Sequence, residues 1–203
     1  TMEVAEQCIQ KRAIRYDKSG DNHYDTVSAF IKSMRGSDPD AALYYLAKML
    51  YAGESVEFIA RRIMISAAED VGMADPNALT VAVSAANAVH QIGMPEAKII
   101  LAEAVVYMAT APKSNASYMG LEKAMSAVQN TKISGIPVHL MDAHYKGAAK
   151  LGHGDGYKYA HDYENHYVNQ QYLPDELVNE VFYNPGDLGY EVKVKEHFKK
   201  IKG

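Results

Sequence analysis

The sequence predicts a mainly α-helical protein: an antiparallel bundle of about six or seven helices, followed by an irregular C-terminal appendage. Through the first 130 residues, apolar side chains recur at a spacing of three and four, the period of a helix with one buried face. Residues that start helices (Asp, Ser, Pro) and glycines that end them punctuate this pattern. After residue 130 the chain becomes rich in Gly, His, Tyr and Asn, and the period is lost.

The strongest prediction is a pair of helices between Asp38 and Gly72. The Asp38 carboxylate can accept the free N–H groups of a first turn, where the missing N–H of Pro39 costs nothing. Gly53 separates the helices, Ser55 caps the second, and Gly72 ends it. The expected inward stripes are Leu43, Leu46, Ala47 and Leu50, widened by Ala42 and Met49, and then Val56, Ile59, Ala60, Ile63, Ala67 and Val71.

The neighbouring helices follow the same pattern. Residues 17–23 are turn-forming types and predict a connector, after which a short helix reaches Met34. Asp75-Pro76 opens a helix that Gly93 ends, and Pro95 opens the next. The expected inward residues are Val27, Phe30, Ile31 and Met34; Leu79, Ala82, Val83 and Ala86; and Ala97, Ile100, Leu101, Ala104, Val105 and Met108.

Beyond the break at Ala111-Pro112-Lys113-Ser114-Asn115, the pattern weakens. A last bundle helix carries Tyr118, Leu121, Met125 and Val128. In the appendage, residues 131–203, we expect only short helices, near 142–150, 174–180 and 190–201, together with a short strand pair.

Composition excludes several classes of protein. The hydrophobic content of 48% and charged content of 23% are those of a soluble globular protein, and no apolar run reaches the roughly 20 residues of a membrane span. The single cysteine, Cys8, excludes an internal disulfide framework and suits a reducing cytoplasm. Because the formal charge is −4, contact with nucleic acid would need a local basic patch.

Several short motifs together resemble one protein family. They are Arg15-Tyr16-Asp17-Lys18, Ser33-Met34-Arg35-Gly36-Ser37-Asp38-Pro39-Asp40-Ala41-Ala42-Leu43-Tyr44, Ile59-Ala60-Arg61-Arg62, Glu69-Asp70-Val71-Gly72, Ala111-Pro112-Lys113-Ser114-Asn115, Tyr157-Lys158-Tyr159-Ala160-His161-Asp162 and Gln171-Tyr172-Leu173-Pro174. The chain resembles the C-terminal region of the replication-associated recombination protein A family (RarA or MgsA), AAA+ ATPases related to the Werner-helicase-interacting ATPase.

The resemblance implies a division of the chain and a function. Residues 1–16 would be the remnant of the AAA+ lid helix. Residues 17–130 would be a helical oligomerisation domain similar to the clamp-loader collar, with residues 131–203 as an appendage packed on it. Family members are homotetrameric, DNA-stimulated ATPases that act in replication-fork maintenance, recombination and repair with single-stranded-DNA-binding protein. The implied location is cytoplasmic and nucleoid-associated, with ATP and Mg²⁺ bound by an N-terminal module outside this chain.

No catalytic, cofactor-binding or metal residue is predicted in this chain. The glycine-rich stretch Gly152-His153-Gly154-Asp155-Gly156 precedes Lys158 but lacks the Gly-Lys-Ser/Thr ending and the following helix of a phosphate-binding loop. We therefore interpret it as a turn and expect no ATP hydrolysis by this chain alone. The rival class, a metal-dependent hydrolase, would depend on His161, Asp162 and His166, which lack the spacing of a recognised zinc motif.

Seven residues are candidates for contacts with DNA or between subunits. Arg61 and Arg62 are adjacent on a helix, so their side chains point about 100° apart. They could contact a second subunit or a phosphate. Alternatively, one arginine faces water and the other forms an ion pair with Glu57 or Glu69. Lys113 follows a break before a helix, where a phosphate contact competes with a solvated lysine. The remaining candidates are Tyr157, Lys158, Tyr159 and His161, whose mixed aromatic and cationic side chains suit base stacking or packing of the appendage equally well.

Two functions therefore remain open at this point. The first is assembly of a RarA-like ATPase through a helical collar, with an apolar surface expected on the helices at 38–52 and 95–111 because their apolar arcs exceed one buried face. The alternative is a stand-alone DNA-binding module that uses the Tyr and Lys residues of the tail.

Overall fold

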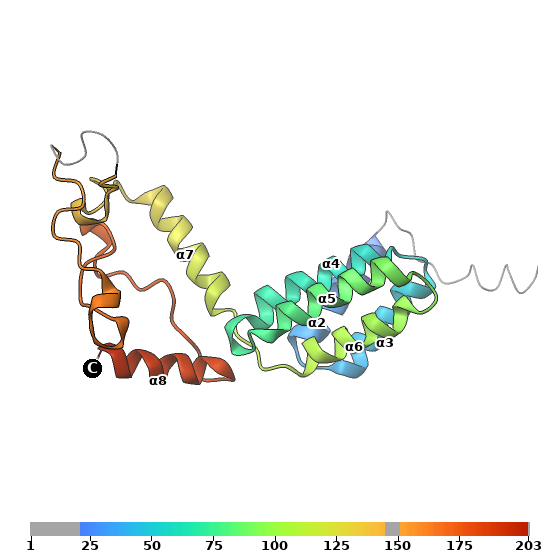
Figure 1. Cartoon of the computed structure of the whole chain (residues 1–203). Coiled ribbons are helices and arrows are strands. Elements are labelled where there is room, and N and C mark those ends of the chain that lie inside the picture. Colours follow the sequence, from blue (N-terminus) through green and yellow to red (C-terminus); the bar gives the residue numbers. More distant parts are fainter. Residues whose placement is uncertain (1–20, 145–150, 203) are drawn as a thin grey trace, which may run out of the picture. The chain divides into compact units, whose positions relative to one another are not determined.

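The chain is mainly helical, as predicted (Figure 1). A computed structural model describes residues 21–144 and 151–202, and within these ranges it contains seven α-helices and no strand. The expected strand pair is therefore wrong for the described part of the tail. The expected lid remnant at residues 1–16 lies outside these ranges. No helix among the described residues is long and apolar enough to cross a membrane.

Two compact units divide the described chain. The helical unit comprises residues 21–115 and 188–190, and the C-terminal unit comprises residues 116–187 and 191–202. The first unit therefore ends before the helix at 116–130, which the sequence analysis placed in the collar at 17–130. The roles assigned to these regions stay predictions.

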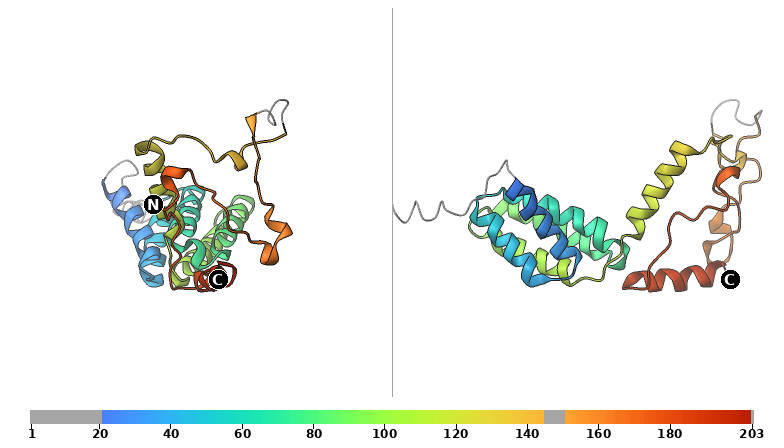
Figure 2. Two further views of the ribbon diagram at one scale, coloured as in Figure 1. Left: turned by 90° about the vertical axis from the view of Figure 1, so that its left-hand side faces the viewer. Right: turned by 180° about the vertical axis from the view of Figure 1, so that it is seen from behind.

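Five helices build the helical unit: α2 (Asp21–Arg35), α3 (Pro39–Tyr51), α4 (Val56–Ser66), α5 (Asn77–Ile92) and α6 (Ala97–Thr110). Helix α6 contacts all four of the others and is apolar on nearly every side, which explains its nearly continuous run of apolar residues (Figures 1 and 2). The fully buried large side chains are Phe30, Met34, Met49, Ile59, Ile63, Leu101 and Met108.

The predicted helix ends are confirmed at the central pair. An Asp38 carboxylate oxygen accepts the Ala41 N–H at 2.9 Å, and the Ser55 hydroxyl accepts the Phe58 N–H at 3.2 Å. Gly53 follows α3 with φ of +76°, the left-handed conformation that glycine adopts without a Cβ penalty. These local signals were sufficient because each acts within one helical turn.

Three predictions of local structure differ from the fold. The expected connector at 17–23 is described only in part, and from Asp21 onward it is the first turn of α2. In α3 the buried side chains are Ala42, Leu46 and Met49, while the expected Ala47 is exposed. In α5 the buried stripe is Ala78, Ala82, Ala85 and Val89, which leaves Leu79 and Val83 exposed. The small alanines permit close approach of neighbouring helices, so packing favoured them over the larger residues.

The C-terminal unit contains few regular elements. They are α7 (Ala116–Asn130), the 3₁₀ turns η3 (Val138–Leu140), η5 (Ala160–Asp162), η6 (Glu164–His166) and η7 (Asp175–Leu177), and α8 (Tyr190–Lys202). The helix expected at 190–201 is confirmed, and the one expected at 174–180 is a single turn. The prediction at 142–150 lies mostly outside the described residues.

Candidate functional site

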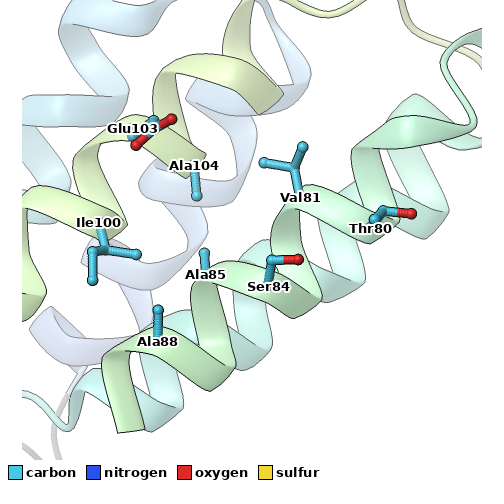
Figure 3. A pocket seen from close by; sticks show the side chains of 8 residues that line it. All are labelled: Thr80, Val81, Ser84, Ala85, Ala88, Ile100, Glu103 and Ala104. Atoms are coloured by element: carbon cyan, nitrogen blue, oxygen red, sulfur yellow. The ribbon is translucent and has the colours of Figure 1, made fainter. Parts of the chain in front are cut away.

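An apolar groove runs between α5 and α6 on the surface of the helical unit (Figure 3). Its volume is about 370 Å³, and small side chains from both helices form its floor. The lining residues are Thr80, Val81, Ser84, Ala85 and Ala88 from α5, and Ile100, Glu103 and Ala104 from α6. The sequence creates this groove because alanine and serine cannot fill the space between the two helix axes.

The two helices that form this groove and their connection also carry exposed large apolar side chains. Ile99 on α6 is 63% exposed, and Val106 lies two turns further along the same helix. Ile92, the last residue of α5, and Met94, in the connection to α6, are also more than half exposed. Apolar side chains gathered in this way mark surfaces that bind another molecule more often than isolated ones do. The expectation of an exposed apolar surface on residues 95–111 therefore agrees with the position of Ile99 and Val106.

One charged residue, Glu103, lines this otherwise apolar groove. Its side chain projects from α6 (Figure 3), and in the helix it stands at i+4 from Ile99 and three residues before Val106, both exposed. Within residues 21–144 and 151–202, no cation forms an ion pair with it and no donor forms a hydrogen bond with its carboxylate. Covering the groove would therefore bury a carboxylate that needs a partner.

A second, charged cleft lies where three of the quoted motifs meet. It has a volume of about 390 Å³ and is lined by Arg35, Glu69, Asp70, Lys113, Ser114 and Asn115. The Arg35 guanidinium donates from Nε to Asp70 Oδ1 at 2.5 Å and from an Nη to Glu69 Oε1 at 3.0 Å. The buried Asp70 carboxylate also accepts the Ser66 hydroxyl at 2.8 Å. The acids therefore hold Arg35 in a fixed position, and Glu69 pairs with Arg35 rather than with Arg61 or Arg62.

The backbone around Asp70 is a π-helical turn, η1 (Ala67–Val71), which continues α4. This wider turn brings the Asp70 carbonyl to the Ser114 N–H, which donates to it at 2.8 Å. Gly72 follows at φ of +50°, and a Cβ there would lie 2.6 Å from the Ser114 carbonyl oxygen. The motifs at 69–72 and 111–115 thus fit together through their backbones, which leaves no room for a side chain at Gly72.

Arg61 and Arg62 contact the same aromatic ring although they point in different directions. Their guanidinium carbons lie 5.9 Å and 5.3 Å from the centroid of the Phe58 ring. Neither arginine forms an ion pair among the described residues, and the buried Nε of Arg62 has no hydrogen-bond acceptor there. Glu57 instead accepts the Ser55 hydroxyl at 2.6 Å, which is the main cause of its lowered pKa; Arg61 adds a smaller attraction.

The Lys113 ammonium is held by three hydrogen-bond acceptors of the helical unit. Its ammonium donates to the carbonyl oxygens of Ala109 at 3.1 Å and Ala111 at 2.6 Å, and to the Ser37 hydroxyl at 3.1 Å. Burial lowers its pKa, and the nearby Asp70 opposes that shift. An ammonium has three N–H donors, so these three acceptors use all of them. The predicted phosphate contact would have to displace one of these bonds.

The four tail candidates lie on one irregular stretch of the C-terminal unit. Tyr157 and Tyr159 are about half exposed, and the ring centroids of Tyr159 and His161 are 5.1 Å apart. His166 extends this row, at 5.0 Å from His161. The backbone of Lys158 is held by the Gln170 side-chain amide, which accepts its N–H at 3.2 Å and donates to its carbonyl at 2.8 Å. The structure therefore brings the tail candidates together and adds His166.

The proposed metal trio of the rival hydrolase does not form a cluster in the described residues, where no three His, Cys, Asp or Glu side chains are placed to hold an ion. His161 and His166 contact each other as rings, at a tilt of 54°. The glycine-rich stretch is a series of turns, with positive φ at Gly152, Gly154 and Gly156.

Two parts of this surface were not foreseen from the sequence. The sequence pattern does not distinguish Glu103 from an ordinary surface acid, because a single acid in an apolar helix usually faces water. Arg35, Glu69 and Asp70 were quoted as motif residues, yet their pairing joins positions 34 and 35 residues apart. The only sequence signal for this contact was that the motifs at 33–44, 69–72 and 111–115 are each rich in charged or turn-forming residues.

Comparison with known proteins gives the family. The model described as "MgsA AAA+ ATPase C terminal" matches residues 36–202, and the model described as "AAA C-terminal domain" matches residues 1–35. The border between these matches falls inside the helical unit, directly after α2. Helix α2 nevertheless supplies Phe30 and Met34 to the core of that unit.

Relatives named in the comparison agree with this match. An uncharacterized AAA domain-containing protein of Mycobacterium tuberculosis is 53% identical over 202 residues, covering 100% of this chain and 45% of its own length. Replication-associated recombination protein A of Bacillus subtilis is 46% identical, with 99% of this chain and 48% of its own length covered. ATPase WRNIP1 of Dictyostelium discoideum is 37% identical over 86% of this chain and 20% of its own length.

The chain thus spans about half the length of the first two of these curated relatives. The match to the C-terminal model covers more than half of the chain, and the quoted motifs predicted the same relationship. The chain belongs to the MgsA AAA+ ATPase C-terminal family.

Proposed function

We propose that this chain is the oligomerisation region of a RarA-like AAA+ ATPase and that it joins the ATPase modules of several copies, as a homotetramer, at damaged or stalled replication forks. The supporting observation is the α5–α6 groove, together with the exposed Ile92, Met94, Ile99 and Val106 on the same two helices and their connection. An apolar surface of this kind gains free energy when a second molecule covers it, at roughly 25 cal/mol per Å² of apolar area removed from water.

We assign the other activities of the family to the region of its members that this chain does not span. In this proposal, ATP and Mg²⁺ are bound by an N-terminal module, and hydrolysis there is coupled to DNA. Contact with single-stranded-DNA-binding protein and a nucleoid-associated, cytoplasmic location belong to the same proposal. This chain contributes assembly: it fixes the distance and orientation between neighbouring modules.

The test is the mass of the purified chain in solution, measured by sedimentation equilibrium at micromolar concentration. We expect a tetramer for the unmodified chain and a smaller species for Ile99→Glu, because a carboxylate in the buried interface would need a partner. Leu79→Glu is the matched control, since Leu79 is also an exposed apolar residue of this helix pair but stands near the start of α5, apart from the face of α6 that carries Ile99, Glu103 and Val106. A monomeric unmodified chain would refute the proposal.

One observation favours the alternative function, a DNA-binding module. The row of rings formed by Tyr159, His161 and His166 offers exposed faces on which bases of single-stranded DNA can stack. The nearby acids Asp155, Asp162 and Glu164 outnumber Lys158, so such binding would depend on stacking and weaken little with added salt. A gel shift with a single-stranded oligonucleotide, compared with Tyr159→Ala, tests it; equal affinities of the two proteins would count against the tail as the binding surface.

A further inference from the structure

Glu103 sets a condition on whatever covers the α5–α6 groove. Its carboxylate lines the groove and has no partner among the described residues, so a molecule docking there must supply a cation or a hydrogen-bond donor. Leaving a buried carboxylate unpaired carries a desolvation penalty that opposes the gain from apolar burial. A partner that fits the groove therefore combines large apolar side chains with at least one cation.

One side of α4, partly buried against the core at Phe58 and exposed at Ile65, carries that combination. Phe58, Arg62 and Ile65 stand at positions i, i+4 and i+7, which places them on one face of the helix. Arg62 lies over the Phe58 ring at 5.3 Å, and Ile65 is an exposed large apolar residue. We call Phe58, Arg61, Arg62 and Ile65 the α4 ridge. Arg61 and Ile65 of this ridge are exposed, and Phe58 and Arg62 are half-buried.

Arg62 can meet an outside carboxylate only through its two Nη groups, which form no hydrogen bond or ion pair among the described residues. Its Nε is buried in the unit, has no acceptor among those residues and is out of reach of a docking molecule. The Phe58 ring restricts the guanidinium to a small region, so less side-chain entropy is lost when it binds a carboxylate. A guanidinium held in this way is suited to two parallel hydrogen bonds with a carboxylate.

Other cations of the helical unit are less suited to Glu103. Arg35 is paired with Asp70 and Glu69, and the Lys113 ammonium is bound to two carbonyls and a hydroxyl. Lys48 contacts Asn22 at 3.5 Å. Lys32 and Lys98 are flexible ammonium groups that no aromatic ring positions. The ridge is therefore the surface of this unit that best combines a cation without an acidic partner with large apolar side chains.

We propose that a second copy of this chain docks its α4 ridge onto the α5–α6 groove, with Arg62 of one copy bound to Glu103 of the other. This inference rests on the proposed function and names the two surfaces that meet. Because ridge and groove are different surfaces, the contact is heterologous and uses both on every copy. Such a contact generates a closed ring when the rotation between copies permits it.

A charge exchange tests the pairing. Glu103→Arg places two cations in the interface and Arg62→Glu places two anions there, so each should weaken self-association by about thirtyfold or more. The variant carrying both substitutions has the pair reversed in every contact and should recover most of the lost association. Lys98→Glu is the matched control, a charge reversal on α6 that lies outside the groove, and it should leave the mass unchanged.

Folding is checked separately by far-ultraviolet circular dichroism and a thermal melt. If Arg62→Glu fails to fold, Glu103→Gln replaces it: removing only the charge should weaken association by about tenfold and reduce its dependence on salt.

Three results would overturn the pairing. They are normal association of both single variants, a double variant no better than the worse single variant, and an equal loss in Lys98→Glu. If the unmodified chain is monomeric, the proposed function itself fails. If the unmodified chain assembles and Ile99→Glu disrupts it while the charge exchange has no effect, the function survives and only the ridge–groove pairing is wrong.

Discussion

Replacing Asp70 with alanine should lower the free energy of unfolding of the helical unit by about 3 kcal/mol. The side chain is only 5% exposed and accepts hydrogen bonds from Arg35 at 2.5 Å and from Ser66 at 2.8 Å. Hydrogen bonds to a charged group contribute about 1.5–3 kcal/mol each, and the Ser66 hydroxyl would remain buried without its acceptor. Arg35 retains Glu69, which offsets part of the loss.

The assay is urea unfolding followed by circular dichroism. Asp70→Ala should move the midpoint to lower urea without changing the slope, because the surface exposed on unfolding stays the same. Glu69→Ala is the control: it removes the other acid bound to Arg35, but with side chains 47% and 35% exposed this pair should contribute less than about 1 kcal/mol. Equal losses in the two variants would refute the reasoning that burial of Asp70 makes its contacts the stronger ones.

Two further predictions concern the C-terminal unit. Burial, followed by the hydrogen bond that Tyr183 donates to Glu191, raises the pKa of the Tyr183 hydroxyl to about 12, so the unfolded chain releases this proton first. The free energy of unfolding should therefore fall by about 2 kcal/mol as the pH rises from about 10 to 12. In Tyr183→Phe, urea titrations at the two pH values should show a decrease that is smaller by this amount. Gly120→Ala should destabilise α7 by about 1–2 kcal/mol despite the higher helix propensity of alanine, because its Cβ would lie 2.9 Å from the Phe182 carbonyl oxygen. Thermal melts should show no such loss in Gly135→Ala, where a Cβ meets nothing within 4 Å.

Helix positions were predictable because their determinants are local. Asp38 and Ser55 cap the helices that follow them, and Gly53 and Gly93 take the left-handed backbone that ends α3 and α5. The choice of buried face was less predictable. Where a helix carries apolar residues on several sides, as α5 does with Leu79, Ala82 and Ala85, the period alone allows more than one stripe. Neighbouring helices then decide which residues are covered.

Some contacts of the candidate surfaces could likewise be predicted from neighbouring residues, and others could not. The tail candidates Tyr157 to His161 are adjacent in sequence, so their proximity was expected, while His166 joined them only through the strained turn at Asn165, where φ is +55°. Arg61 and Arg62 were expected to act apart, since adjacent helical side chains diverge. Phe58, one turn earlier, lies within 6 Å of both guanidinium groups.

By itself the sequence determined the helical class, most helix boundaries and the family, because capping residues, apolar period and short motifs are properties of neighbouring residues. Tertiary structure alone decided that Arg35 is held by Glu69 and Asp70, that small side chains leave a groove between α5 and α6, and that Glu103 lines it without a partner in the described residues. These features depend on how closely helices far apart in sequence approach each other. That distance is set by the packing of whole side chains, which no local pattern specifies.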